Sequence, residues 1–294
     1  MARGSSALAT TSRQAGRAEW LPVRSPTSAA PTSAVQAGGQ LPGGAPAPGA
    51  DGLAQAGTVL AVIARPGPES ADLGALLYAY SQAGADLAVL SLTRGEASPV
   101  NSTRSRLEAV RPWELQLASW LLGVSSVAVA DYPDGGLRDC PLPDLTARVQ
   151  RAIAEHAPDL ILVVDPATGD CDDARVAQAV SLAAQPAGVP VAARTSHGAR
   201  GGWRVELGDQ ADAARAVQRS AVRAHASQSE AVPGMLFNSD HLGNHEQLRW
   251  LRPAAATPQV LVPRAAVEPC DGEVAPAVLD YSELRTPIPA ASVS

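Results

Sequence analysis

The sequence predicts a three-layer α/β domain, in which a mostly parallel β-sheet lies between two layers of helices. Two features of the chain carry this prediction. Short runs of aliphatic and β-branched residues alternate along the chain with longer segments whose apolar residues recur at helical spacing. In addition, the two kinds of segment follow each other strictly, which is typical of parallel strands joined by crossover helices.

The predicted elements begin at residue 58. The run TVLAVIA, residues 58–64, is apolar throughout, as expected of a strand that is buried on both faces. A helix is predicted over residues 69–84, because Leu73 and Leu76 stand at helical spacing and Gly84 can cap its end.

The same alternation continues to residue 229. Pro112 is expected in the first turn of its helix, where a missing N–H is tolerated. Further strands are predicted at residues 86–92, 127–132, 159–166, 189–195 and 203–207, and further helices at residues 107–123, 142–157, 173–185 and 209–229.

The composition predicts three regions. Residues 1–56 consist mostly of Ala, Gly, Pro, Ser and Thr, which bury too little apolar area to offset the entropy of ordering, so we expect a disordered segment. Residues 57–252 form the predicted α/β domain. Residues 253–294 are irregular and Pro-rich, and we expect a tail there.

Charge and cysteine content narrow the class of protein. The net charge of −6 argues against a nucleic-acid partner, which needs a basic face. No apolar run is long enough for a membrane span, and residues 1–56 lack the continuous apolar core of a secretory signal. Three cysteines without CxxC spacing fit a reducing compartment. We therefore expect a soluble cytoplasmic protein.

A small-molecule site is expected at the carboxyl ends of the strands, where ligands bind in open parallel sheets. Polar and acidic residues follow four of the predicted strands, within residues 65–70, 93–96, 133–136 and 165–173. The first of these loops contains neither GxGxxG nor GxxxxGK[ST], so a dinucleotide or P-loop site is not predicted. Acidic residues also favour helix N-termini, so the pattern by itself identifies no chemistry.

Four blocks of the chain resemble one known family. They are TVLAVIA with the proline at 66, LGALLYAYSQAGADLAVLSLTRGEAS, LEAVRPWELQLASWLLGV and VADYPDGGL. In this order they resemble the PIG-L/LmbE deacetylases, and the resemblance runs from Thr58 to Ala179 and continues weakly to the segment HASQ at 225–228. It implies a Rossmann-like fold and zinc-dependent hydrolysis of N-acetyl groups on glucosamine-containing substrates.

The chain departs from this family at the metal-binding motifs. The family's first loop is AHPDD, in which the His and the second Asp bind zinc and the first Asp acts as general base. Here those positions are Arg65, Pro68 and Gly67. The family's third motif resembles HPDH, whose last His binds metal and whose first His helps to stabilise the oxyanion. Asp173 and Asp170 stand there, so Asp173 is the single aligned position able to coordinate a metal.

The positions that the resemblance assigns to substrate contact are retained. Glu96 of TRGE, Arg111 of VRPWE and Asp134 of PDGG match residues that lie near the sugar or position the loops in relatives. Arg65 allows two interpretations: it neutralises a phosphate or carboxylate of the ligand, or it pairs with Asp170 or Asp173 and fills the altered motif. We favour the second.

Two other metal sites are conceivable from the residues alone. Five carboxylates near one edge offer oxygen ligands for Mg²⁺, Mn²⁺ or Ca²⁺, although solvated acids at helix starts are the simpler interpretation. These are Glu69, Asp72, Asp170, Asp172 and Asp173. The pair His241 and His245 has i, i+4 spacing, but Gly243 lies between them and no third ligand is evident.

The sequence therefore predicts a PIG-L/LmbE-like protein that binds an amino-sugar-like small molecule and has lost the standard zinc deacetylase chemistry, with no cofactor. One alternative is an active N-acetyl amide hydrolase, in which Glu69, Asp72 and Asp173 hold zinc or another divalent cation and Asp172 is the catalytic base. Another alternative is a non-catalytic scaffold that binds a partner through its cleft or tails.

Overall fold

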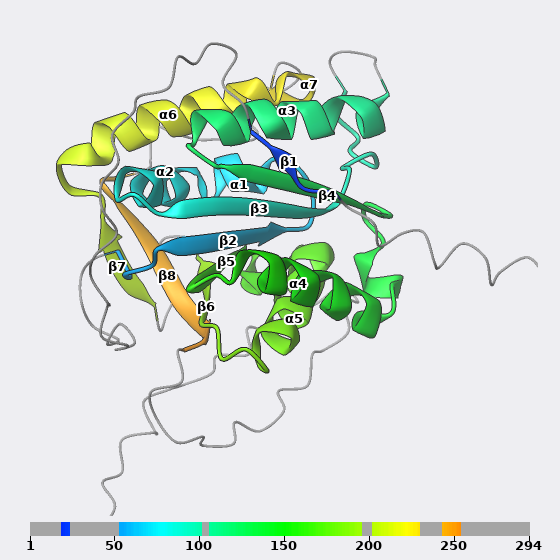
Figure 1. Ribbon diagram of the computed structural model, residues 1–294. Helices are drawn as coiled ribbons and strands as arrows, with labels where there is room; N and C mark the ends of the chain where they lie inside the picture. Colours follow the sequence, from blue (N-terminus) through cyan, green and yellow to red (C-terminus); the bar gives the residue numbers. More distant parts are fainter. Residues whose placement is uncertain (1–18, 24–52, 102–105, 196–201, 230–242, 254–294) are drawn as a thin grey trace, which may run out of the picture.

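A computed structural model describes residues 19–23, 53–101, 106–195, 202–229 and 243–253. These residues form an eight-stranded sheet with helices on both faces, in the order β1-β4-β3-β2-β5-β6-β8-β7 (Figure 1). The five central strands, from β4 to β6 in this order, run parallel to one another. The strands β1, β8 and β7 pair antiparallel with their neighbours. The prediction of a mostly parallel sheet is confirmed.

The bounds of the elements are as follows. The strands are β1 Leu21–Pro22, β2 Thr58–Ile63, β3 Asp86–Thr93, β4 Ser126–Tyr132, β5 Leu160–Val164, β6 Val191–Arg194, β7 Trp203–Glu206 and β8 His245–Arg252. The helices are α1 Pro68–Ala71, α2 Gly74–Gln82, α3 Leu107–Leu121, α4 Leu142–His156, α5 Cys171–Ala184, α6 Ala211–Ala224 and α7 Ala226–Ser229, with 3₁₀ turns at Leu137–Asp139, Pro166–Thr168 and Gly208–Gln210.

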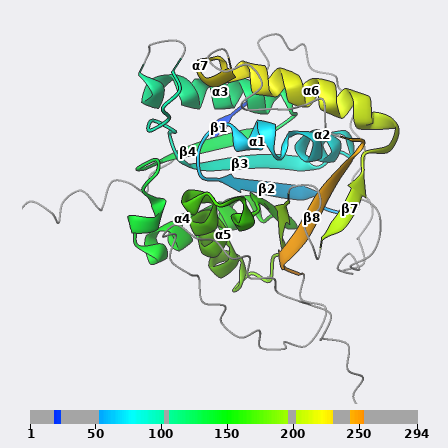
Figure 2. The same ribbon diagram turned by 180° about the vertical axis from the view of Figure 1, so that it is seen from behind.

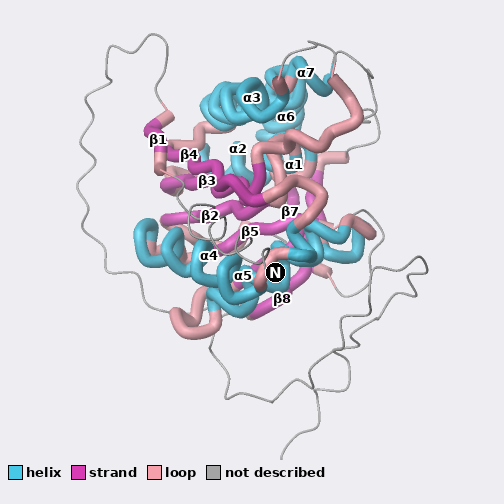
Figure 3. Tube along the Cα trace, turned by 90° about the vertical axis from the view of Figure 1, so that its right-hand side faces the viewer, coloured by secondary structure: helices cyan, strands magenta, loops and turns pink. Residues whose placement is uncertain are grey.

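Two hydrophobic cores separate the three layers. The view along the sheet in Figure 3 shows α4 and α5 on one face, with α2, α3 and α6 on the other. Successive residues of β2 supply both cores: Leu60 and Val62 pack into the first, and Val59 and Ala61 into the second. This alternation is why an uninterrupted apolar run was the correct signal for a strand that is covered on both faces.

Two predicted helices are each divided in the structure. The segment 69–84 forms α1 and α2, because the N–H of Leu73 bonds to the carbonyl of Pro68 and interrupts the regular α-helical ladder. The segment 209–229 is interrupted at His225, whose backbone is not helical (φ −81°, ψ 59°). Both interruptions lie at the carboxyl edge of the sheet, where the side chains of Glu69 and His225 meet.

Pro112 lies inside α3 and not in its first turn, which corrects the prediction from sequence. A proline there leaves the carbonyl four residues earlier without its helical donor. That carbonyl belongs to Glu108, and it accepts a hydrogen bond from Arg94 Nη1 at 3.4 Å. The side chain from the loop after β3 therefore replaces the missing backbone donor.

Two strands were not predicted. The strand β1 is short and exposed, and it extends the sheet beyond β4 from within the segment that we expected to be disordered; the rest of that segment, except 53–56, lies outside the described residues. The strand β8 lies beside β7 (Figure 2) and pairs with both β6 and β7, so that β7 forms the other edge of the sheet. The strand β8 has the sequence HEQLRWLR, which lacks a continuous apolar run, and its Glu246 is wholly buried. Within the described ranges, no helix is both long enough and apolar enough to cross a membrane.

Candidate functional site

A cavity of about 460 Å³ opens at the carboxyl edge of the sheet. Its walls come from the loops after β2, β3 and β4 and from the ends of α3, α6 and α7. Five charged or titratable residues line it, and each was singled out or lies in a motif quoted from the sequence: Arg65, Asp72, Arg111, Asp134 and His225. The loops that follow neighbouring parallel strands meet here, as the topology requires.

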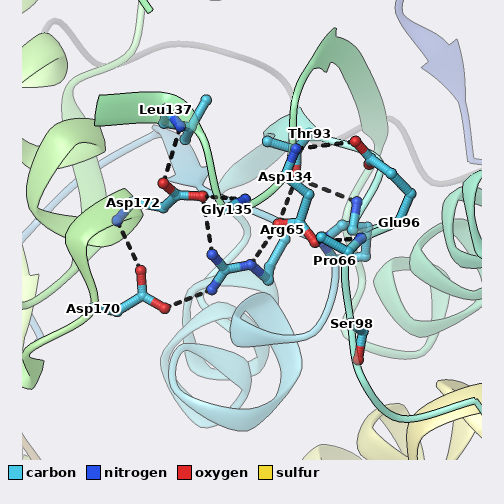
Figure 4. A network of polar contacts seen from close by, with 12 residues as sticks. Arg65, Pro66, Thr93, Glu96, Ser98, Asp134, Gly135, Leu137, Asp170 and Asp172 are labelled. Carbon is cyan, nitrogen blue, oxygen red and sulfur yellow. Dashed lines mark hydrogen bonds and ion pairs between the residues drawn. The ribbon is translucent and has the colours of Figure 1, made fainter. Parts of the chain in front are cut away.

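Arg65 forms ion pairs with three carboxylates (Figure 4). Its Nε lies 2.7 Å from Asp134 Oδ1, its Nη1 lies 2.7 Å from Asp170 Oδ2 and its Nη2 lies 3.0 Å from Asp172 Oδ2. Burial opposes the charge of Arg65, but Asp170 and Asp134 outweigh it and raise the pKa of the guanidinium. The pairing with Asp170 was one of the two interpretations of Arg65, whereas no ion pair is described between Arg65 and Asp173.

The carboxylate of Asp172 is engaged on both oxygens. Oδ2 accepts from Gly135 N at 2.8 Å as well as from Arg65, and Oδ1 accepts from Leu137 N at 3.0 Å. The side chain is 2% exposed. These contacts fasten the loop after β4 to the start of α5. They also occupy both oxygens of Asp172, which a general base would use to accept a proton from water.

Asp134 and Glu96 hold the loops that form the cavity wall. Asp134 Oδ2 accepts from Ala97 N at 3.0 Å, and Asp134 N donates to Glu96 Oε1 at 3.0 Å. The loops after β3 and β4 are therefore joined by reciprocal bonds, as Figure 4 shows. Of the two roles that the resemblance offers for these residues, their contacts match the positioning of loops.

Arg111 is 4% exposed and reaches across the base of the cavity from α3. Its Nη1 donates to the carbonyl of Gly95 and its Nη2 to the carbonyl of Pro66. A Cβ at position 95 would lie 2.1 Å from Arg111 Nη1, and the backbone there has φ +73°, so glycine is required at position 95. Burial lowers the pKa of Arg111, since the described carboxylates act on it only from a distance.

Glu69 and His225 form a buried pair that the sequence did not predict. Glu69 Oε1 lies 2.6 Å from His225 Nε2 and accepts from Ser70 Oγ at 2.7 Å, and both members of the pair are at most 2% exposed. Burial disfavours the charge of Glu69, but its interaction with His225 outweighs burial and lowers its pKa. The single signal in the sequence was the segment HASQ at 225–228, to which the resemblance continues weakly.

Two further residues of HASQ hold α7 in place, and one of them, Gln228, lines the cavity. Ser227 donates through N and Oγ to the carboxylate of Glu114, both at 2.7 Å. Gln228 accepts from Ser98 Oγ at 2.6 Å and donates to the carbonyl of Val100 at 3.0 Å. The segment therefore docks α7 onto α3 and onto the loop after β3, and so completes the wall of the cavity.

Asp72 belongs to a second charged network. Its Oδ1 accepts from Arg194 Nη1 at 3.2 Å, and Arg194 Nε lies 3.1 Å from Glu246, which also pairs with Arg215. Burial, followed by the charges of Glu246 and Glu69, raises the pKa of Asp72 despite Arg194. This network fastens β6 and β8 to the cavity wall.

Asp173 has no cation of its own. Its side chain forms no hydrogen bond or ion pair that the structure describes, and the residue is 8% exposed. Burial and the neighbouring charge of Asp170 raise the pKa of Asp173 to about 7. Asp170 itself caps α5, accepting from the N–H groups of Asp172 and Asp173 at 2.8 and 3.2 Å.

The described residues do not fit a zinc ion. Zinc needs about three side-chain ligands and an open position for water. The carboxylates nearest to Arg65 are bonded to its guanidinium, whose fixed positive charge repels a cation. Glu69 and Asp72 face His225 and Arg194. Across the described ranges no group of three or more His, Cys, Asp or Glu side chains could hold a metal.

The last metal site considered from the sequence is the pair His241 and His245, and the structure describes only one of these two residues. His245 begins β8, and His241 lies outside the described residues.

Comparison with known proteins identifies relatives of this domain. The profile of the PIG-L family, described as GlcNAc-PI de-N-acetylase, matches residues 60–184. A Bacillus anthracis protein named "Probable N-acetyl-alpha-D-glucosaminyl L-malate deacetylase 2" is 30% identical over 113 residues, which are 37% of this chain and 50% of that protein. The chain therefore spans about half the length of the curated relative it matches.

Two solved structures share the fold. The N,N'-diacetylchitobiose deacetylase of Pyrococcus horikoshii has a TM-score of 0.53 and 18% identity, covering 67% of this chain and 84% of that one. GalB, the 4-carboxy-2-hydroxymuconate hydratase of Pseudomonas putida KT2440, has a TM-score of 0.53 and 16% identity, covering 69% and 99%. The same architecture therefore carries a deacetylase in one organism and a hydratase in another.

We expect Arg65→Met to destabilise the protein by about 3–5 kcal/mol, because it leaves the buried carboxylates of Asp134 and Asp172, and the more exposed Asp170, without their cation. Arg204→Met is the matched control: Arg204 pairs with one carboxylate and is 53% exposed, so its loss should cost less than about 1 kcal/mol. Urea unfolding at neutral pH measures both. Equal losses for the two variants would show that the Arg65 network contributes no more than a surface pair.

Asp173→Asn should change how stability depends on pH. In the folded protein the pKa of Asp173 is raised to about 7, whereas the carboxyl group of an aspartate in the unfolded chain has a pKa of 3.8. The wild type therefore loses stability relative to the Asn variant as pH rises from about 4 to about 7. Urea unfolding of both proteins across this range measures the difference. A difference that stays constant with pH would contradict the raised pKa.

Proposed function

We propose that this chain, whose residues 60–184 match the profile of the PIG-L family of de-N-acetylases, is a member of that family that binds an amino-sugar-like small molecule and lacks the standard zinc N-deacetylase chemistry. The observation that carries the proposal is the ion-pair network of Arg65. Arg65 stands at the position of the first metal-binding residue of the family motif and forms ion pairs with three carboxylates around it. In this proposal the guanidinium of Arg65, which is part of the chain, takes the place of an exchangeable metal ion.

The cavity supports the binding half of this proposal. It has the volume of a small-ligand site, and its walls combine prolines and Val222 with a few polar groups. Ring C–H groups of a sugar can pack on the prolines. Ser98 Oγ and Gln228 Oε1 are bonded to each other, and each keeps an acceptor lone pair to which a sugar hydroxyl can donate. In this proposal Arg65 and Arg111 line the ligand site, and Glu96 and Asp134 position its loops.

The location and partners follow from the chain's charge and cysteine content. We place the protein in the cytoplasm, because three cysteines without CxxC spacing suit a reducing compartment. A net charge of −6 favours a small-molecule ligand over nucleic acid.

The rival hydrolase needs Glu69, Asp72 and Asp173 as metal ligands and Asp172 as base. The contacts argue against it, since Glu69 is bonded to His225 and both oxygens of Asp172 accept other donors. The rival would regain support only if these residues rearranged around a metal.

We expect the purified protein, expressed with zinc, manganese and magnesium supplied and then freed of loosely bound ions, to hold far less than one equivalent of any of them. The reason is electrostatic, because Arg65 repels a divalent cation and occupies its carboxylates. Mass spectrometry of the metal content measures this. One tightly held equivalent, together with hydrolysis of an N-acetylated sugar, would refute the proposal.

Ligand binding is expected to depend on the volume of the cavity. Glucosamine and N-acetylglucosamine serve as probes, titrated into labelled protein and followed by NMR. Ser98→Trp places an indole against the cavity and should abolish the chemical-shift changes caused by a bound sugar. Ser220→Trp, at an exposed position on α6, is the control and should leave them intact. Sugar binding that survives Ser98→Trp would place the site elsewhere.

A further inference from the structure

Three of the four large apolar side chains that the described residues expose lie on one face of the molecule. They are Trp113 and Leu117 on α3, which are 71% and 49% exposed, and Leu21 on β1, which is 47% exposed. The fourth, Leu182, lies on α5, on the opposite face of the sheet (Figure 3). Single exposed apolar residues are ordinary on protein surfaces, whereas a contiguous group of them marks an interaction surface.

The helix α3 is apolar on its outer side as well as on its inner side. Leu115 and Ala118 are wholly buried in the core beneath the helix. On the outer side Trp113, Leu117 and Leu121 follow one another at four-residue spacing, and residues with this spacing are neighbours on a helix surface. A helix that is apolar all round is expected to be covered on every side, and the described part of the chain covers only the inner side of α3.

No charged side chain interrupts the outer side of α3. Between residues 109 and 125, all of which the structure describes, the charged residues are Arg111 and Glu114, and both are buried. The helix α6 packs beside α3 in the same layer (Figure 1), and it exposes Asp212 and Arg223. A helix face that meets only water normally carries charged or polar residues. The outer side of α3 therefore has the composition of a covered surface.

The apolar surface continues from α3 onto the edge of the sheet. Leu21 pairs with Val127, whose side chain lies in the core under α3, so Leu21 points to the same side of the sheet. The N–H of Val23 donates to the carbonyl of Ser125, just beyond α3, and the side chain of Val23 packs on the same core as Leu121. We refer to the whole surface as the α3 face; it consists of Leu21, Val23, Trp113, Leu117 and Leu121.

The α3 face is complementary to a second copy of itself. Its most exposed side chain, Trp113, and the half-buried Leu121 lie four residues on either side of Leu117. A two-fold axis at Leu117, with the two helices antiparallel, places Trp113 of each copy on the partner's Leu121, so that a protruding side chain meets a lower one. Leu117 then lies against its own copy. Because the face carries no charge, this contact brings no like charges together.

Other kinds of occupant fit this surface less well. A peptide that adds a strand to the sheet needs a free edge, but β1 has only 2 residues and Pro22 has no N–H to donate. Nucleic acid and anionic lipid need exposed basic side chains, which the α3 face lacks.

We propose that two copies of this chain pair through the α3 face, about a two-fold axis at Leu117. The contact covers Trp113 and the outer side of α3 and extends to Leu21 at the edge of the sheet. The inner side of the same helix carries Arg111 and Glu114, which hold the loops and α7 around the cavity. The dimer therefore supports the cavity wall from outside without adding a residue to the cavity.

Analytical ultracentrifugation of the full chain, over about 1 to 100 µM, tests this dimer. We expect a monomer–dimer equilibrium in the wild type. Leu117→Arg places two guanidinium groups against each other at the axis, so it should weaken self-association about a hundredfold or more. Leu182→Arg is the matched control, because it makes the same change at a leucine of similar exposure on α5, and it should leave self-association unchanged. Circular dichroism checks that both variants fold.

A disulfide crosslink tests the position of the axis. Leu117→Cys should join two copies of the chain through the substituted position in the presence of oxidised glutathione, because the axis places this residue against its own copy. Leu182→Cys is the control and should not form such a link. Peptide mapping without reductant distinguishes these links from any that involve the three native cysteines.

The inference fails in any of three cases. A wild-type chain that stays monomeric at the highest of these concentrations does not form the dimer. A dimer that withstands Leu117→Arg as well as it withstands Leu182→Arg is held by another surface. A monomer that floats with phosphatidylcholine vesicles, and no longer does so after Leu117→Arg, uses the α3 face for a lipid surface. The binding of a sugar in the cavity is measured separately and is decided by none of these results.

Discussion

The architecture of the site depends on the guanidinium of Arg65. It projects from the end of β2 and binds one carboxylate from the loop after β4 and two from the start of α5. These segments are distant in sequence and meet at a single planar group whose fork of donors suits several carboxylates at once. Asp172 extends the connection to the backbone of Gly135 and Leu137. The loops keep their arrangement through an internal ion-pair network.

A second constraint is the docking of α6 and α7 against the first loop and α3. Glu69 binds His225, and Glu114 binds Ser227 through both its N–H and its hydroxyl. Both carboxylates are buried, so leaving either without its partner would be costly. The break between α6 and α7 at His225 follows from this requirement, since a continuous helix would place that side chain differently. These buried polar pairs thus hold this part of the cavity wall in place.

The comparisons show how little the fold alone says about chemistry. A deacetylase and a hydratase share this architecture with the chain. The chemistry of the present protein depends on the side chains at its strand ends, where Arg65, Gly67 and Pro68 stand at the positions that the resemblance to the PIG-L deacetylases aligns with the AHPDD motif.

The sequence by itself determined the order of the central elements and the altered motif. The alternation of apolar runs with helical periodicity located β2, β3 and β4, because strands buried on both faces leave a continuous hydrophobic signal. It also showed that Arg65 and Asp170 would lie at one edge. Tertiary structure decided which carboxylates Arg65 binds, that Pro112 lies inside α3, and that β8 joins the sheet with Glu246 in its interior. Such contacts join residues far apart in the chain, and no local pattern encodes them.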